Sequence, residues 1–183
     1  LVSTYGLFVT KFEKKLKKIV KKKQVIAVNS GTSALHLSLI AAGVEENSYV
    51  LTQPLTFVAT CNAVSYCRAK PIFIDINEDF LSMCPIILDE WLNKNAIINK
   101  YNHCVYKKDG MKISACLFVN TFGHPSQSKE INQICKKWKI KTIEDGAESL
   151  GSMYHNEHVG KFSDFYKYMP LVLWHGVFLF LNR

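Results

Sequence analysis

The sequence lacks a long hydrophobic run and any cysteine pattern typical of a metal site. Its last apolar stretch, 171–181, contains His175 and Gly176 and falls short of the roughly 18 to 20 residues that a membrane span needs. The 6 cysteines include no Cys-x-x-Cys pair and no Cys/His cluster with zinc spacing. We expect no secretory leader. The sequence therefore predicts reduced, buried thiols in a cytoplasmic protein, with no metal site and no transmembrane segment.

Internal repeats, low-complexity linkers and domain boundaries are also missing from these 183 residues. A chain of this length can enclose one hydrophobic core but is too short for two full-sized domains. The first residue, Leu1, is not methionine, and the last residues have almost no polar continuation. We therefore expect a fragment that is incomplete at both ends.

Acidic residues are too few to balance the basic ones, which leaves a net charge of +8. An excess of positive charge of this size can indicate that the protein binds nucleic acid or an anionic membrane. Most of the excess lies in segment 11–23, where 8 lysines surround apolar residues that recur every three or four positions from Phe8 to Val20. This spacing predicts an amphipathic helix with the lysines on its outer face. A solvated helix face is the favoured interpretation, and binding to nucleic acid or a membrane surface is the alternative.

Short apolar runs alternate with stretches of helical periodicity along the chain. This alternation predicts an α/β fold in which parallel strands are joined by crossover helices. In such sheets, ligands bind beyond the carboxyl ends of the strands, where the loops converge. Segments 30–33, 53–57 and 121–124 and the residue Asp145 each follow a predicted strand, so we expect them to share one site. The expected strands are 25–28, 49–51, 71–74, 113–119 and 141–143, the expected helices are 32–42, 57–68, 85–98 and 126–138, and we expect a loop at 100–112 and a hairpin at 151–160.

The segment 29–37 reads Asn-Ser-Gly-Thr-Ser-Ala-Leu-His-Leu and opens a predicted helix directly after a predicted strand. The free backbone N–H groups of Gly31, Thr32 and Ser33 would form a cradle for a phosphate. The same residues could serve only as a helix cap, and the two interpretations are compatible. Within the helix, we expect His36 to be packed in the core.

The segment 143–151 reads Ile-Glu-Asp-Gly-Ala-Glu-Ser-Leu-Gly and places Asp145 at the end of a hydrophobic strand. A carboxylate held in a cleft there could pair with a protonated ring nitrogen and keep the ring an electron sink. The alternative is a carboxylate that only caps the following loop. We expect the neighbouring Glu144 to be structural.

Together with two further motifs, these segments resemble a known family. The four motifs are VNSGTSALHLSL, LTQPLTFVATCNAVSYCRAKPIFIDI, VNTFGHPSQ and IEDGAESLGSMYHNEHVGKFSDF, in that order along the chain. From about Ser3 to Phe165 the sequence is similar to the DegT/DnrJ/StrS family of nucleotide-sugar aminotransferases, which depend on pyridoxal phosphate (PLP). The resemblance implies an incomplete large domain of the three-layer α/β/α fold of fold-type I PLP enzymes.

The resemblance also implies an activity for the parent enzyme. We expect it to transfer an amino group from an amino acid such as glutamate to a keto sugar attached to a nucleotide, in the biosynthesis of surface polysaccharides. It implies a homodimer for the full-length parent and no nucleic-acid or membrane partner. In this family the turn at Gly31, Thr32 and Ser33 holds the PLP phosphate. Phe57 lies against the pyridine ring, where stacking contributes on the order of 1 kcal/mol beyond area burial; a core aromatic is the alternative.

Three further residues take roles from the resemblance. Asp145 is the expected catalytic carboxylate, because an ionised Asp keeps the ring nitrogen protonated and so stabilises the carbanion formed on the substrate. Glu148 stands where many relatives carry Gln and is expected near the 3-hydroxyl side of the cofactor. His124 is expected to line the pocket and contact the substrate, or else to be a surface loop residue.

The resemblance stops where family members carry the lysine that forms the Schiff base. That lysine belongs to a Ser-Phe-x-x-x-Lys segment, but residues 166–183 read YKYMPLVLWHGVFLFLNR and contain no such segment. Trp174 stands near the expected place, and Lys167 is too close to Asp164 to match. Because transamination needs a lysine amine both for the imine and as a base, we expect this polypeptide to be inactive. We divide the chain into a partial PLP-binding domain, 1–165, and a divergent tail, 166–183, that is truncated or frameshifted.

Three alternatives remain open. A PLP-binding pseudoenzyme or vestigial fragment would keep the cofactor residues and lack the lysine. A related sugar dehydratase with a histidine in the lysine position is conceivable because His175 lies one residue from that place, but its surroundings do not match. A basic nucleic-acid-binding protein would bind DNA through segment 11–23 in a salt-sensitive way.

Overall fold

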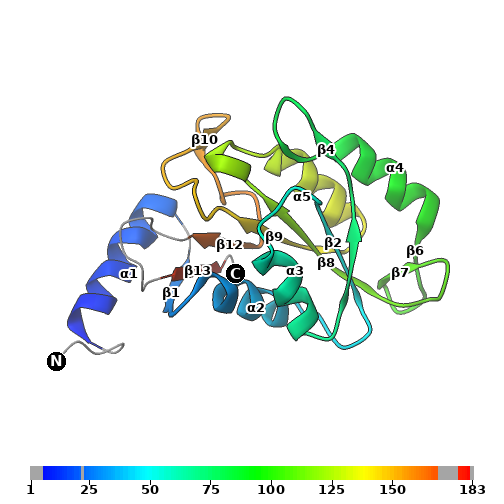
Figure 1. Ribbon diagram of the computed structural model, residues 1–183, viewed down its shortest axis with the longest axis horizontal. Coiled ribbons are helices and arrows are strands. Elements are labelled where there is room, and N and C mark those ends of the chain that lie inside the picture. Colours follow the sequence, from blue (N-terminus) through cyan, green and yellow to red (C-terminus); the bar gives the residue numbers. More distant parts are fainter. Residues whose placement is uncertain (1–5, 22, 169–176, 182–183) are drawn as a thin grey trace.

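The computed structural model describes residues 6–21, 23–168 and 177–181. Its centre is a seven-stranded sheet in the order β1, β13, β12, β9, β8, β2, β3 (Figure 1). All neighbouring strands are parallel except β13, which is antiparallel to both β1 and β12. The prediction of an α/β fold with a mostly parallel sheet is confirmed. The strands are β1 (Gln24–Val28), β2 (Tyr49–Thr52), β3 (Lys70–Phe73), β8 (Ile113–Val119), β9 (Lys141–Asp145), β12 (Phe165–Tyr168) and β13 (Val177–Leu181).

Helices cover both faces of this sheet (Figure 1). One hydrophobic cluster packs α2 and α3 against the sheet, and a second packs α4 and α5 against the opposite face. None of the helices in the described ranges combines the length and the apolar character that a membrane span requires. The predicted helices are confirmed, with shifted ends: α2 (Gly31–Ala41), α3 (Ala59–Tyr66), α4 (Pro85–Asn95) and α5 (Ser128–Lys137).

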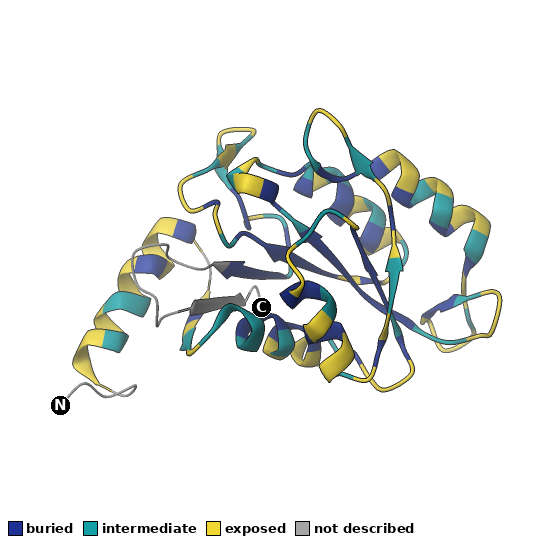
Figure 2. Ribbon diagram, in the orientation of Figure 1, coloured by how far each residue is buried: buried dark blue, intermediate teal, exposed yellow. Residues whose placement is uncertain are grey.

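The strand β8 shows how the three layers are held together. Ala115 and Leu117 belong to the cluster on the α2 and α3 side, whereas Cys116 and Phe118 belong to the cluster on the α4 and α5 side. Successive side chains of a strand point to opposite faces, so a strand that is apolar throughout is buried on both. Figure 2 shows the central strands as buried and the outer faces of the helices as exposed.

The expected boundary between residues 165 and 166 lies inside β12. This strand pairs in parallel with β9, and β13 lies between β12 and β1. The described residues after 165, which are 166–168 and 177–181, therefore belong to the same sheet as the preceding strands. Segment 169–176, with Trp174 and His175, lies outside the described residues, so the prediction about the lysine position stays untested.

The basic segment forms α1 (Leu7–Val20), as the spacing predicts. Leu16 and Val20 are buried against β1 and β12, and the described lysines of segment 11–23 are exposed. The Glu13 carboxylate accepts a hydrogen bond of 2.8 Å from the backbone N–H of Ala27, which satisfies a donor of the β1 strand. The interpretation as a solvated helix face agrees with this packing. Nucleic-acid binding stays a prediction, and salt-sensitive binding of DNA would support it.

Two local predictions are wrong. The helix expected over 85–98 ends at Asn95, and the next residues form β6 (Ala96–Ile98), which pairs with β7 (Cys104–Tyr106) inside the expected loop. The β-branched Ile97 and Ile98 favour a strand over a last helical turn. The Asn99 side chain then accepts hydrogen bonds from the N–H groups of Tyr101 and His103, which builds the turn between the two strands.

The hairpin expected over 151–160 is confirmed as β10 (Met153–Tyr154) and β11 (Glu157–His158). His155 and Asn156 at its tip have positive φ angles of 49° and 60°, as a type I′ turn requires. A third small pair joins β4 (Ile76–Asn77) to β5 (Ser82–Met83). His36 is only half-buried, with its ring edge-on to Tyr66 at 5.8 Å, which corrects the expectation of a core histidine: it lies on the flank of α2 that faces α3.

Candidate active site

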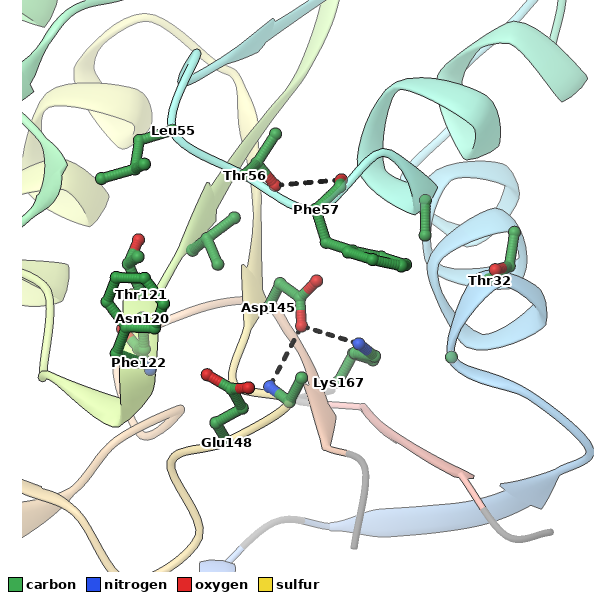
Figure 3. Close-up of a pocket in the computed structure, with 14 residues that line it drawn as sticks. Thr32, Leu55, Thr56, Phe57, Asn120, Thr121, Phe122, Asp145, Glu148 and Lys167 are labelled. Atoms are coloured by element: carbon green, nitrogen blue, oxygen red, sulfur yellow. Dashed lines mark hydrogen bonds and ion pairs between the residues drawn. The ribbon is translucent and has the colours of Figure 1, made fainter. Parts of the chain in front are cut away.

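A cavity of about 470 Å³ lies at the carboxyl edge of the sheet (Figure 3). Its walls come from the N-terminus of α2, the segment between β2 and α3, the loop after β8, the end of β9 with the loop beyond it, and β12. Segments far apart in sequence therefore meet in one place, as predicted from the strand ends. Of the expected residues, the cavity is lined by Gly31, Thr32, Phe57, Asp145 and Glu148.

Asp145 is the last residue of β9 and is 4% exposed. Its Oδ1 atom accepts a hydrogen bond of 3.1 Å from the backbone N–H of Ala147 and one of 2.9 Å from Nζ of Lys167. No described residue donates a hydrogen bond to the other oxygen, Oδ2. The carboxylate is thus held through one oxygen and keeps the second for a ligand in the cavity (Figure 3).

A buried network lies behind Asp145. The Asn120 amide donates to Glu144 Oε1 at 2.9 Å and to Ser149 Oγ at 3.0 Å, while the backbone N–H of Gly160 also donates to Glu144 Oε1 at 3.0 Å. The backbone N–H of Asn120 donates to the carbonyl oxygen of Asp145 at 2.9 Å. These bonds tie the end of β8 to the end of β9. They support the structural role expected of Glu144, which is fully buried.

The N-terminus of α2 is capped by its own chain. Ser30 Oγ accepts a hydrogen bond of 3.1 Å from the backbone N–H of Ser33, and the two hydroxyls are 2.8 Å apart. The N–H of Ser33 is therefore not free, contrary to expectation, because the cap takes it. The N–H groups of Gly31 and Thr32 have no acceptor among the described residues. The N–H of Ser33 thus belongs to the helix cap, whereas those of Gly31 and Thr32 can still serve as the phosphate cradle.

Aromatic side chains form the rim of the cavity. Phe57 precedes α3 and is 78% exposed. Phe122, which sequence reasoning did not select, is 73% exposed and lies in the short 3-10 turn η1 (Thr121–Gly123) with a positive φ of 54°. His124 follows that turn, is exposed, and is not among the residues that line the cavity. The motif 121–124 pointed to the correct loop, but Thr121 and Phe122 line the cavity, and His124 does not.

Gln53 lies in the expected segment 53–57, but sequence reasoning gave it no role of its own. Its side chain is fully buried at the end of β2 and makes four hydrogen bonds. The amide nitrogen donates to the carbonyl oxygen of Leu55 and to Thr121 Oγ1, at 2.8 and 3.2 Å. The amide oxygen accepts from the N–H groups of Met83 and Val119, both at 3.0 Å. Gln53 thus holds two walls of the cavity in place, and a polar residue directly after a buried strand was its only signal.

Lys167 is another residue to which sequence reasoning gave no role. It lies on β12 in register with Asp145 on the adjacent β9, and the two side chains are each 6% exposed. Tyr166, the preceding residue, points to the opposite face and packs against Gly146 and Gly160. Spacing from Asp164 had excluded Lys167 as a match to the family lysine. A lysine inside a buried strand is itself a signal, because such a charge is rarely buried without a partner.

The donors and acceptors of this cavity fit a phosphorylated pyridine. Gly31 and Thr32 offer free N–H groups for a phosphate, and Phe57 offers an aromatic face for a ring. Asp145 offers a carboxylate oxygen for a protonated ring nitrogen. Among the described residues that line the cavity, Lys167 carries the one primary amine, and it is bound to Asp145.

The chain is similar to known aminotransferases. The model of the DegT/DnrJ/EryC1/StrS aminotransferase family matches residues 1–168. A UDP-4-amino-4,6-dideoxy-N-acetyl-beta-L-altrosamine transaminase of Campylobacter jejuni serotype O:2 is 34% identical over 180 residues, which cover 96% of this chain and 44% of the relative. The crystal structure of a DegT DnrJ EryC1 StrS aminotransferase from Brucella abortus has a TM-score of 0.83 and 29% identity, covering 97% of this chain and 47% of that one.

A third structure is similar in fold. NtdA from Bacillus subtilis, with the bound cofactor PMP, has a TM-score of 0.77 and 24% identity, covering 98% of this chain and 38% of NtdA. The chain spans less than half the length of each of these three proteins. The fold-class prediction is confirmed.

Proposed function

Because this chain belongs to the DegT/DnrJ/EryC1/StrS aminotransferase family, we propose that its cavity binds PLP. For the whole protein we propose transfer of an amino group from an amino acid to a keto sugar attached to a nucleotide, in surface-glycan biosynthesis. The Campylobacter relative, named as a transaminase of a UDP-linked amino sugar, supports the substrate class. The observation that carries the proposal is Asp145, a buried carboxylate at a strand end with one oxygen free toward the cavity.

Each wall of the cavity has a part in this proposal. The N–H groups of Gly31 and Thr32 donate to the phosphate, and the phenyl ring of Phe57 covers one face of the pyridine ring. Oδ2 of Asp145 would accept a hydrogen bond from the protonated ring nitrogen, and Glu148 would face the 3-hydroxyl side. Bound PLP supplies the electron sink that stabilises the substrate carbanion. His124 does not line the cavity, and its role in this proposal is to contact the sugar nucleotide.

This polypeptide itself binds the cofactor without rapid turnover. Proton transfer and imine exchange need a free amine near the cofactor, whereas the amine of Lys167 is engaged by Asp145. The same ion pair favours the second candidate, a PLP-binding pseudoenzyme. The whole protein is a homodimer in this proposal, as the resemblance implies.

Titration with pyridoxamine phosphate (PMP) tests the binding proposal. PMP has the ring and phosphate of PLP but no aldehyde, so its affinity reports the cavity alone. We expect Asp145→Asn to weaken PMP binding about tenfold or more, because a neutral amide is a poor acceptor for a pyridinium. The matched control is Asp109→Asn, an exposed carboxylate on the β7 side of the molecule, which leaves binding unchanged. If no variant, the native chain included, binds PMP or PLP, the proposal is wrong.

A further inference from the structure

We propose that Lys167 is an internal counter-ion that competes with the ring nitrogen of the cofactor for Asp145, and so weakens cofactor binding. The inference rests on the proposed function, because it concerns the same cavity. It assigns Lys167 as a positioning residue, which acts on the cofactor through Asp145. The consequence is a site that exchanges its cofactor with solution more readily than its lining would otherwise allow.

The sheet dictates the contact. Parallel pairing places Lys167 opposite Asp145, so both side chains leave the sheet on the same face. Nζ of Lys167 lies 2.9 Å from Oδ1 of Asp145, and no other described residue accepts a hydrogen bond from this amine. The contact therefore follows from strand register and does not require a particular loop conformation.

The effect of the Lys167–Asp145 pair on cofactor binding follows from the charges that line the cavity. The described lining of the cavity contains two carboxylates, Asp145 and Glu148, and one cation, Lys167. The ammonium already neutralises Asp145, since a buried carboxylate needs a paired charge. A protonated ring nitrogen at Oδ2 would be a second cation at the same carboxylate. Repulsion between two cations in a site shielded from water disfavours that arrangement.

The pair also stabilises the empty cavity. Without Lys167, Asp145 would be a buried charge with only the N–H of Ala147 as a partner. Such a site binds a ligand that carries its own positive charge more tightly. Removal of the ammonium is therefore expected to lower stability of the empty protein and to raise its affinity for the cofactor.

A double-mutant cycle with PMP tests the inference. We expect Lys167→Met, which keeps the length of the side chain without its charge, to bind PMP about tenfold more tightly than the native chain. In the Asp145→Asn background the same substitution is expected to change affinity by less than about twofold, because no carboxylate then keeps the ring nitrogen protonated and a neutral ring is not repelled by Lys167. Lys167→Arg keeps the charge and is expected to match the native chain. The control for loss of a lysine is Lys112→Met. Lys112 is partly exposed and pairs with Glu45.

Thermal unfolding with and without PMP provides a second readout. We expect Lys167→Met to unfold at a lower temperature than the native chain when empty, and to gain more from PMP. Binding by Lys167→Met where the native chain shows none would also support the inference.

Several outcomes would overturn it. Equal PMP affinity of the native chain and Lys167→Met would refute the competition and leave the PLP proposal intact. An equal gain in affinity in both backgrounds would show that Lys167 does not act through Asp145. A phosphopyridoxyl mass on the Lys167 peptide, after PLP and borohydride, would show that the amine leaves Asp145 and reacts. Absence of binding in every variant would instead refute the proposed function.

Discussion

Asp145 and Phe57 line the same cavity, but Asp145 is 4% exposed and Phe57 is 78% exposed. The floor of the cavity, around Asp145, is made by strand ends, in-register side chains and buried hydrogen bonds. The rim, at Phe57 and Phe122, is made by loop residues with large exposed rings. The fold itself therefore organises the part of the site that would hold a ring nitrogen. The contribution of the two rim rings depends on the ligand that they contact.

The largest effect is expected at the tight packing behind the floor, on the face of the sheet opposite Lys167. A Cβ atom at Gly146 or Gly160 would overlap the buried ring of Tyr166, and Gly160 also has a positive φ of 83°. We expect Gly160→Ala to lower the free energy of unfolding by about 3 kcal/mol, from overpacking and backbone strain together. Urea unfolding measures the loss. Gly6→Ala, where a Cβ meets nothing within 4 Å, is the control, and an equal loss there would contradict the argument.

The next effect separates the hydrogen bonds of the floor from its packing. Asn120 donates to Glu144 and Ser149, and its side-chain oxygen accepts from the N–H of Ser126 at 3.0 Å. We expect Asn120→Ala to lower the free energy of unfolding by about 2 kcal/mol, because it leaves buried polar groups without a partner. PMP affinity should fall as well, because Glu144, the neighbour of Asp145 on β9, loses a hydrogen bond that fixes the end of this strand. Unchanged stability would mean that water replaces the amide.

At the rim, stability and binding are expected to separate. Phe57→Ala removes an exposed ring, so we expect the free energy of unfolding to stay within about 0.5 kcal/mol. Loss of stacking on a flat ring should weaken PMP binding about fivefold, which corresponds to roughly 1 kcal/mol. Equilibrium unfolding and PMP titration on the same sample measure both quantities. A large loss of stability without a change in affinity would make Phe57 a core aromatic, which was the alternative from the sequence.

The division between floor and rim also explains how far the sequence could predict this site. β8 was predicted at the bounds that the structure shows, and Asp145 was placed at a strand end, because both follow from apolar periodicity. Lys167 was missed because its contact depends on the register between β9, which ends at Asp145, and β12, which begins at Phe165 and was not predicted as a strand. The hydrogen bond that occupies the N–H of Ser33 depends on one side-chain rotamer of Ser30. Periodicity reports which face is buried, but not which two side chains meet.

The smallest effect concerns His124, which lies beside the rim without lining the cavity. We expect His124→Ala to change neither stability, within about 0.5 kcal/mol, nor PMP affinity, because its side chain is exposed. If it contacts a sugar nucleotide, as the sequence predicts, binding of a UDP-sugar to the PMP-loaded protein should weaken. Calorimetry with UDP-N-acetylglucosamine and with UDP alone separates contacts to the sugar from contacts to the nucleotide. A weaker affinity for PMP would instead extend the cavity to His124, and the rim would then include a side chain that the geometry places outside it.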